Sequence, residues 1–130
     1  MAVGLVVISH SPHLSKGVFD LVKQAMPTIN VADAGGTDNG EIGTSAIKIK
    51  EAIESVNSGD GVAVFFDFGS AVMNAEMAIE LLEEDIEVEL ADAPLVEGAY
   101  AAVMQAGFGK SLKEVVDEAV KARQAEKIVR

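Results

Sequence analysis

Short, almost wholly apolar segments alternate with longer helical patterns along this chain, and this alternation constrains the fold more than any other feature. Residues 3–8 and 62–66 are apolar runs, interrupted only by Gly4. Runs of this length are typical of strands that are buried on both faces of a parallel sheet. Residues 28–32 are interpreted as a further short strand. In residues 86–90 apolar side chains alternate with glutamates, a pattern that predicts an edge strand.

Helical patterns fill the segments between the predicted strands. Pro27 ends the first helix, and Ser111 and Glu114 form a capping box for the last one. Helices are expected at about residues 14–26, 44–56, 69–82, 94–106 and from 112 onward. This order predicts a doubly wound α/β fold, with a mainly parallel central sheet and helices on both faces. We expect residues 1–130 to form one domain, with a frayed tail after about residue 124.

The charged residues are unevenly distributed along the chain. Residues 1–50 carry four basic and four acidic side chains, whereas residues 51–130 carry six basic and seventeen acidic ones, a net charge of −11. Such a surface repels nucleic acid and anionic membranes and suits a basic protein partner, although solubility alone would explain it equally well. The chain has no cysteine, and its first apolar run is too short for a signal peptide or a membrane span. We therefore expect a cytoplasmic protein.

Two polar loops follow the buried strands, where parallel α/β sheets collect their chemistry. His10 lies in the first loop and Asp67 in the loop after the third strand. If these strands are neighbours, the two side chains converge, and the carboxylate fixes one ring nitrogen while the other becomes a nucleophile. A phosphohistidine site requires this arrangement. The alternative is that His10 is an ordinary polar residue and that Asp67 caps a helix.

A glycine-rich loop, residues 35–43, follows the second strand. Helices that begin near His13, Thr44 and Ser70 would then direct their N-termini toward the same edge, and helix N-termini attract anions. Parallel α/β folds place helix N-termini there in any case, so this feature permits a phosphate site without proving one. The loop is not followed by the Gly-Lys-Ser/Thr of a Walker motif, and we do not expect this chain alone to bind a nucleotide.

Metal and flavin chemistry are weakly supported by the same loops. His10 and His13 are three residues apart, but no third and fourth ligand is evident, so we expect no metal and assign His13 to the rim of the site or to a partner contact. The serines after the first strand are faintly similar to a flavin-phosphate loop. The chain has no tryptophan and only one tyrosine, Tyr100, to stack on a flavin ring, and we expect no cofactor.

Four segments resemble the phosphotransferase-system subunit of phosphoenolpyruvate-dependent dihydroxyacetone kinase. They are Ser9-His10-Ser11, Gly40-Glu41-Ile42-Gly43-Thr44-Ser45, Asp67-Phe68-Gly69-Ser70-Ala71 with Asn74-Ala75-Glu76, and Ala93-Pro94-Leu95-Val96-Glu97-Gly98-Ala99. That family is similar to mannose-type enzyme IIA domains, and the resemblance covers essentially the whole chain. It implies that His10 is phosphorylated and that Asp67 orients it. Thr44, Gly69 and Ser70 are placed near the phosphate.

The resemblance also implies a phosphotransferase activity and a set of partners. The phosphoryl group would come from the phosphocarrier protein HPr and pass to ADP held on a second kinase subunit, while a third subunit binds dihydroxyacetone. The family implies a homodimer as well. One alternative is the enzyme IIA component of a mannose-type sugar transporter, which has the same chemistry and another acceptor. A second alternative is a non-catalytic α/β binding or regulatory domain.

Overall fold

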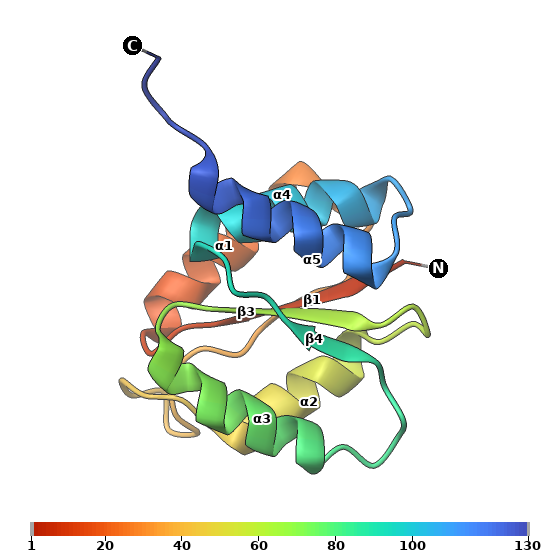
Figure 1. The fold of residues 1–130 in the computed structure, drawn as a ribbon. Helices are drawn as coiled ribbons and strands as arrows, with labels where there is room; N and C mark the ends of the chain where they lie inside the picture. Colours follow the sequence, from red (N-terminus) through yellow and green to blue (C-terminus); the bar gives the residue numbers. More distant parts are fainter. Residues whose placement is uncertain (1, 130) are drawn as a thin grey trace.

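The computed structural model describes residues 2–129 and contains a parallel sheet between two layers of helices (Figure 1). The strands are β1 (Gly4–Ile8), β2 (Val31–Asp33), β3 (Val62–Phe66) and β4 (Val88–Leu90). They are ordered β2-β1-β3-β4, and each neighbouring pair is parallel. The predicted α/β class with a parallel central sheet is therefore confirmed, and the strand order reverses between β1 and β3.

Helices cover both faces of this sheet. They are α1 (Pro12–Ala25), α2 (Ala46–Val56), α3 (Val72–Glu80), α4 (Leu95–Gly107) and α5 (Leu112–Lys121), with short 3-10 turns η1 (Gly69–Ala71) and η2 (Ala122–Gln124). Helices α1, α4 and α5 form one layer, and α2 and α3 form the other (Figure 1). No helix within residues 2–129 is long and apolar enough to cross a membrane.

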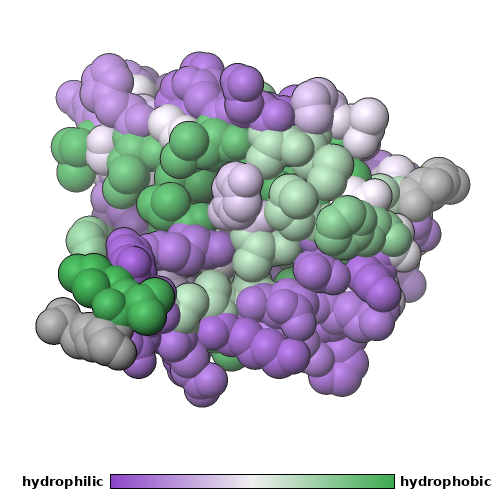
Figure 2. Space-filling view, turned by 90° about the horizontal axis from the view of Figure 1, so that it is seen from above, coloured by the Kyte–Doolittle hydropathy of each residue, from purple (hydrophilic) through white to green (hydrophobic). Residues whose placement is uncertain are grey.

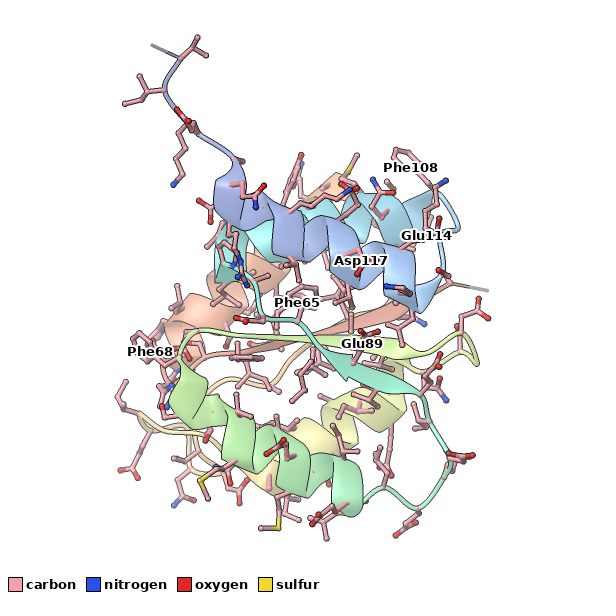
Figure 3. The ribbon with its side chains drawn as sticks, in the orientation of Figure 1. Phe65, Phe68, Glu89, Phe108, Glu114 and Asp117 are labelled. Atoms are coloured by element: carbon pink, nitrogen blue, oxygen red, sulfur yellow. The ribbon has the colours of Figure 1, made fainter. Side chains whose placement is uncertain are left out.

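The central strands are apolar throughout because their alternate side chains enter two different cores. Leu5 and Val7 pack in the core under α1, α4 and α5, while Val6 and Ile8 pack in the core over α2 and α3. Burial of each such side chain stabilises the fold by about 1.5–3 kcal/mol. Figure 3 shows Phe65 of β3 on the side of the sheet that faces α5. Glu89 of β4 is exposed, as expected for an edge strand.

The boundaries of three elements differ from the predicted ones. In two of them, a residue is buried without belonging to a strand. The second strand was predicted at residues 28–32 but begins at Val31, because Ile29 enters the core from the preceding turn. Likewise Ile86 is buried ahead of β4, which begins only at Val88. The helix predicted from residue 69 starts as the turn η1 and becomes α-helical at Val72.

Serine caps fix the helices that begin at the carboxyl edge of the sheet. Ser11 accepts a hydrogen bond from the Leu14 N–H at the start of α1, and Ser45 accepts one from the Lys48 N–H at the start of α2. These caps satisfy backbone donors that have no partner within the helix. The loops that precede both helices are thereby held in place beside the ends of β1 and β2.

Candidate active site

His10 and Asp67 lie side by side at the carboxyl edge of the sheet. Ile8 and Phe66 are paired in register between β1 and β3, so the loops that follow the two strands start at the same level. The His10 Nδ1 atom is 3.0 Å from Oδ1 of Asp67. The side chain of His10 is 25% exposed, whereas that of Asp67 is 9% exposed. The structure thus brings the two residues together, with the ring accessible and the carboxylate beneath it.

The Asp67 carboxylate accepts hydrogen bonds from four donors. Oδ1 accepts from the His10 ring and from the Phe68 N–H, at 3.0 and 2.8 Å. Oδ2 accepts from the Ser9 hydroxyl and from the His10 N–H, at 2.9 and 3.0 Å. Burial raises the pKa of this carboxyl group, but the bonds from His10, Ser9 and Phe68 outweigh burial and hold the pKa below its ordinary value. Asp67 is therefore an acceptor only, and it fixes the His10 loop at both its backbone and its ring.

The second ring nitrogen of His10 faces the solvent side of the site. Since Nδ1 donates its hydrogen to Asp67, the neutral ring carries a lone pair on Nε2. The Ser70 hydroxyl lies 3.0 Å from Nε2, in a position to donate to this lone pair. The Phe68 ring lies beside the imidazole, with ring centroids 5.5 Å apart and planes tilted by 47°. Nε2 is thus the nitrogen available for chemistry, and one hydroxyl accompanies it.

The glycine-rich loop supports the His10 loop from the side of β2. The Gly36 N–H donates to the Ser9 carbonyl at 3.0 Å, and the Gly43 N–H donates to the His10 carbonyl at 2.8 Å. Gly36 has φ +79° and Gly43 has φ +138°, conformations that residues with a Cβ rarely adopt. The Lys48 ammonium donates to loop carbonyls, including that of Gly35 at 2.8 Å. The loop therefore acts as a brace that holds His10 in place.

The other residues assigned to the site from the sequence are Thr44, Gly69 and His13. The Thr44 hydroxyl accepts a hydrogen bond from the Asn74 amide at 2.6 Å and so joins the glycine-rich loop to α3. Gly69 is exposed in η1, and His13 is exposed in the first turn of α1. In the part of the chain that the structure describes, the His10 ring is hydrogen-bonded to Asp67 and Ser70 and to none of these three residues.

Three contributors to the site were not assigned a role from the sequence. Ser9 is completely buried and donates to Asp67 while accepting from the Ser11 N–H. Lys48 looks like an ordinary helix residue, and Asn74 like an ordinary polar position of α3. Their roles depend on which loops meet at the sheet edge, and only the fold shows this. Within residues 2–129 no cluster of three or more histidine, cysteine, aspartate or glutamate side chains could hold a metal ion.

Comparison with known proteins identifies the class to which this fold and site belong. Residues 4–116 match the sequence model of the EIIA-man family, described as the fructose IIA component of the phosphotransferase system. The matched segment includes all four strands. The chain therefore belongs to the EIIA-man family.

Curated relatives within this class are named as subunits of dihydroxyacetone kinase. A protein of Listeria innocua, named phosphoryl donor subunit DhaM of a PEP-dependent dihydroxyacetone kinase, is 48% identical over 78% of this chain and 80% of its own length. A DhaM of Lactococcus lactis is 37% identical over 91% of this chain and 96% of its own length. A DhaM of Escherichia coli is 43% identical over 96% of this chain, which spans only 28% of that longer protein. The resemblance predicted from the four sequence segments is confirmed.

Solved structures agree with the fold. A crystallised protein of unknown function has a TM-score of 0.85 and 34% identity, with complete coverage of both chains. The phosphotransferase component EIIA of Streptococcus agalactiae has a TM-score of 0.69, with 14% identity over 98% of this chain and 96% of its own. At that identity the likeness supports the architecture alone.

Proposed function

We propose that this chain is the phosphoryl donor subunit of a dihydroxyacetone kinase and that it carries the phosphoryl group on His10. The observation that carries this proposal is the pairing of His10 Nδ1 with Asp67, which leaves Nε2 accessible as a nucleophile. The names of relatives at 48% and 37% identity supply the acceptor system. In this proposal residues 1–130 act as a single domain in the cytoplasm.

Phosphoryl uptake is proposed to occur from a phosphohistidine on the carrier protein HPr. The Nε2 lone pair attacks the phosphorus in line, a new P–N bond forms, and the bonding pair of the old P–N bond returns to the donor histidine. The Nδ1 proton stays in its hydrogen bond to Asp67. The phosphorylated ring becomes an imidazolium, and the neighbouring carboxylate stabilises its positive charge. Because the protein makes no further covalent bond, positioning accounts for most of the catalysis.

Phosphoryl transfer to ADP reverses the charge changes on the ring. A terminal phosphate oxygen of ADP, held on the nucleotide subunit, attacks the phosphorus, and the P–N electron pair returns to Nε2. The Ser70 hydroxyl, 3.0 Å from Nε2 in this structure, is proposed to donate to a phosphoryl oxygen when Nε2 is occupied. Thr44 and Gly69 are proposed to complete the phosphate cradle, and His13 to lie on its rim. Donor and acceptor need the same nitrogen, so the two steps take place in sequence.

A two-step transfer assay tests this proposal. The chain is incubated with phosphoenolpyruvate, enzyme I and HPr, and the phosphorylated protein is then isolated and mixed with the ADP-loaded nucleotide subunit. We expect one acid-labile, base-stable phosphate on His10 and its quantitative transfer to ADP. A chain that takes up no phosphate would match the non-catalytic alternative. Transfer to a sugar-transporter component instead of ADP would match the transporter alternative.

A homodimer is proposed from the apolar face over α1, α4 and α5. Figure 2 shows apolar side chains gathered over this layer, and Val96 and Tyr100 of α4 are exposed at 41% and 49%. A groove of about 480 Å³ lies between α4 and the end of α5. Large contiguous apolar patches are typical of interfaces, and a second copy related by a two-fold axis would cover this face.

Light scattering at micromolar concentration should give twice the 13.6 kDa of one chain. Tyr100→Glu places a charge in the proposed interface and should shift the mass toward that of one chain. Ile42→Glu introduces the same charge at an exposed loop position outside this layer and should leave the mass unchanged. A wild-type chain that scatters only as a 13.6 kDa species would contradict the dimer.

A further inference from the structure

An exposed apolar stripe begins beside His10 and continues along α3. Phe68, which lies against the His10 ring, is 64% exposed, and Met73 and Met77 are 79% and 50% exposed. Leu81, at the end of the helix, is also exposed. Met73, Met77 and Leu81 are four residues apart, so they lie on one face of the helix. We name Phe68, Met73, Met77 and Leu81 the α3 stripe.

The α3 stripe places large apolar side chains on the exposed face of a surface helix. The residues of α3 that are completely buried against the sheet layer are alanines, Ala75 and Ala78. Ile79 is partly buried against the same core, but both methionines of α3 face the solvent, whereas most surface helices direct large apolar residues inward. Folding alone does not account for this arrangement. Methionine is also unusually adaptable in contact with other proteins, so the stripe has the composition of a docking surface that continues from the active site.

The charges around the α3 stripe define the chemistry of the protein that it contacts. Residues 67–92 contain nine acidic residues and no lysine, arginine or histidine. Glu76 and Glu80 are exposed on α3 itself. The partners of the His10 ring are a carboxylate and a hydroxyl group, so no cation within residues 2–129 is hydrogen-bonded to the ring that would hold the phosphoryl group. A partner with basic side chains complements both this acidic surface and a transferring phosphoryl group.

We propose that the α3 stripe and its glutamates form the docking surface for the ADP-bearing kinase subunit; this inference rests on the proposed function. Transfer to ADP brings several further negative charges to His10, and neutralising them requires cations from the partner, such as basic side chains and nucleotide-bound Mg²⁺. The acceptor, unlike HPr, must align a bound nucleotide with a ring that is only 25% exposed. An apolar contact that extends beyond the mouth of the site supplies this alignment, and we expect uptake from HPr not to require it.

The double variant Met73→Gln/Met77→Gln tests the proposal. Glutamine has nearly the length and helix propensity of methionine, and both positions are exposed, so the fold is retained while the apolar contact is lost. The matched control is Phe108→Gln, which changes an apolar residue that is 63% exposed. Figure 3 shows Phe108 at the opposite corner of the molecule from Phe68.

The two half-reactions are measured separately. For the double variant, we expect the rate of uptake from phospho-HPr to stay within twofold of wild type. The concentration of ADP-loaded subunit that gives the half-maximal transfer rate should rise at least tenfold, and the control should match wild type in both steps. In the variant Glu76→Gln/Glu80→Gln, the rate of transfer to the ADP-loaded subunit should depend less on salt concentration than in wild type.

Two results for the double variant would overturn the docking proposal alone. One is an unchanged acceptor step, and the other is an equal loss in both half-reactions, which would mean that the stripe does not discriminate between partners. A wild-type chain that takes up phosphate but passes none to ADP would overturn the proposed function together with this inference. If wild type transfers phosphate to ADP normally, the proposed function stands, and the result for the double variant tests the docking proposal alone.

Discussion

Replacing His10 with glutamine should abolish phosphoryl uptake from phospho-HPr while the protein remains folded. Glutamine has a similar size, but its amide nitrogen has no lone pair available for attack on phosphorus. The His10 side chain is part of neither hydrophobic core and lies in a loop at the sheet edge, so its replacement removes little packing. The measurement is the amount of labelled phosphate per chain, accompanied by far-ultraviolet circular dichroism to verify the fold.

His13→Ala is the matched control for this experiment. It removes the other histidine of the chain, three residues away and exposed at the start of α1. We expect this variant to take up one phosphate per chain and to transfer it with a modestly reduced rate, because the rim loses one polar contact. Normal phosphorylation of His10→Gln, combined with loss of phosphorylation in His13→Ala, would assign the reaction to His13 and contradict the proposed site.

The sheet could be predicted from the sequence because both of its central strands are buried on two faces. Residues 4–8 and 62–66 show no polar interruption, a pattern that is typical of strands buried on both faces of a parallel sheet. Strand ends were harder to predict, since Ile29 and Ile86 are buried without being in a strand. An apolar pattern in the sequence indicates which side chains are buried. In turns, a buried side chain need not belong to a paired strand.

The candidate site was only partly predictable for a similar reason. The position of His10 and Asp67 after buried strands follows from topology, once the strands are taken as neighbours. The Ser9 hydroxyl, the Gly36 and Gly43 N–H groups and the Lys48 ammonium contact the site or its loops across long sequence separations. Serine, glycine and lysine are common in loops and on helices. Their contribution therefore emerges only when the three loops are seen together.

Asp67→Asn should slow phosphoryl uptake by about 100-fold or more without unfolding the protein, because a fixed histidine tautomer can contribute that much to a rate. All four groups that face the carboxylate are hydrogen-bond donors. An amide NH₂ group in its place would therefore meet another donor. An amide nitrogen at the Oδ1 position would face the Phe68 N–H and the His10 ring, which favours the tautomer with the proton on Nε2. At the Oδ2 position it would face the His10 N–H. In either orientation a backbone donor loses its partner.

The pH dependence of stability gives an independent measure of the same carboxylate. The pKa of Asp67 in the folded protein lies below the ordinary value of 3.8, so ionisation of this group stabilises the fold at pH values above 3.8. This contribution is lost as the pH falls through the folded-state pKa. The part of the difference in unfolding free energy between wild type and Asp67→Asn that comes from ionised Asp67 should therefore shrink as the pH falls below about 4.

Combining both measurements separates a positioning role from a purely structural one. A structural role alone predicts a loss of stability with near-normal phosphoryl uptake by the molecules that remain folded. Positioning predicts slow uptake by fully folded Asp67→Asn, since the hydrogen bond at Nδ1 determines whether Nε2 carries the lone pair. Near-normal uptake by this variant would remove Asp67 from the mechanism, and His10 would then need another group to fix its tautomer.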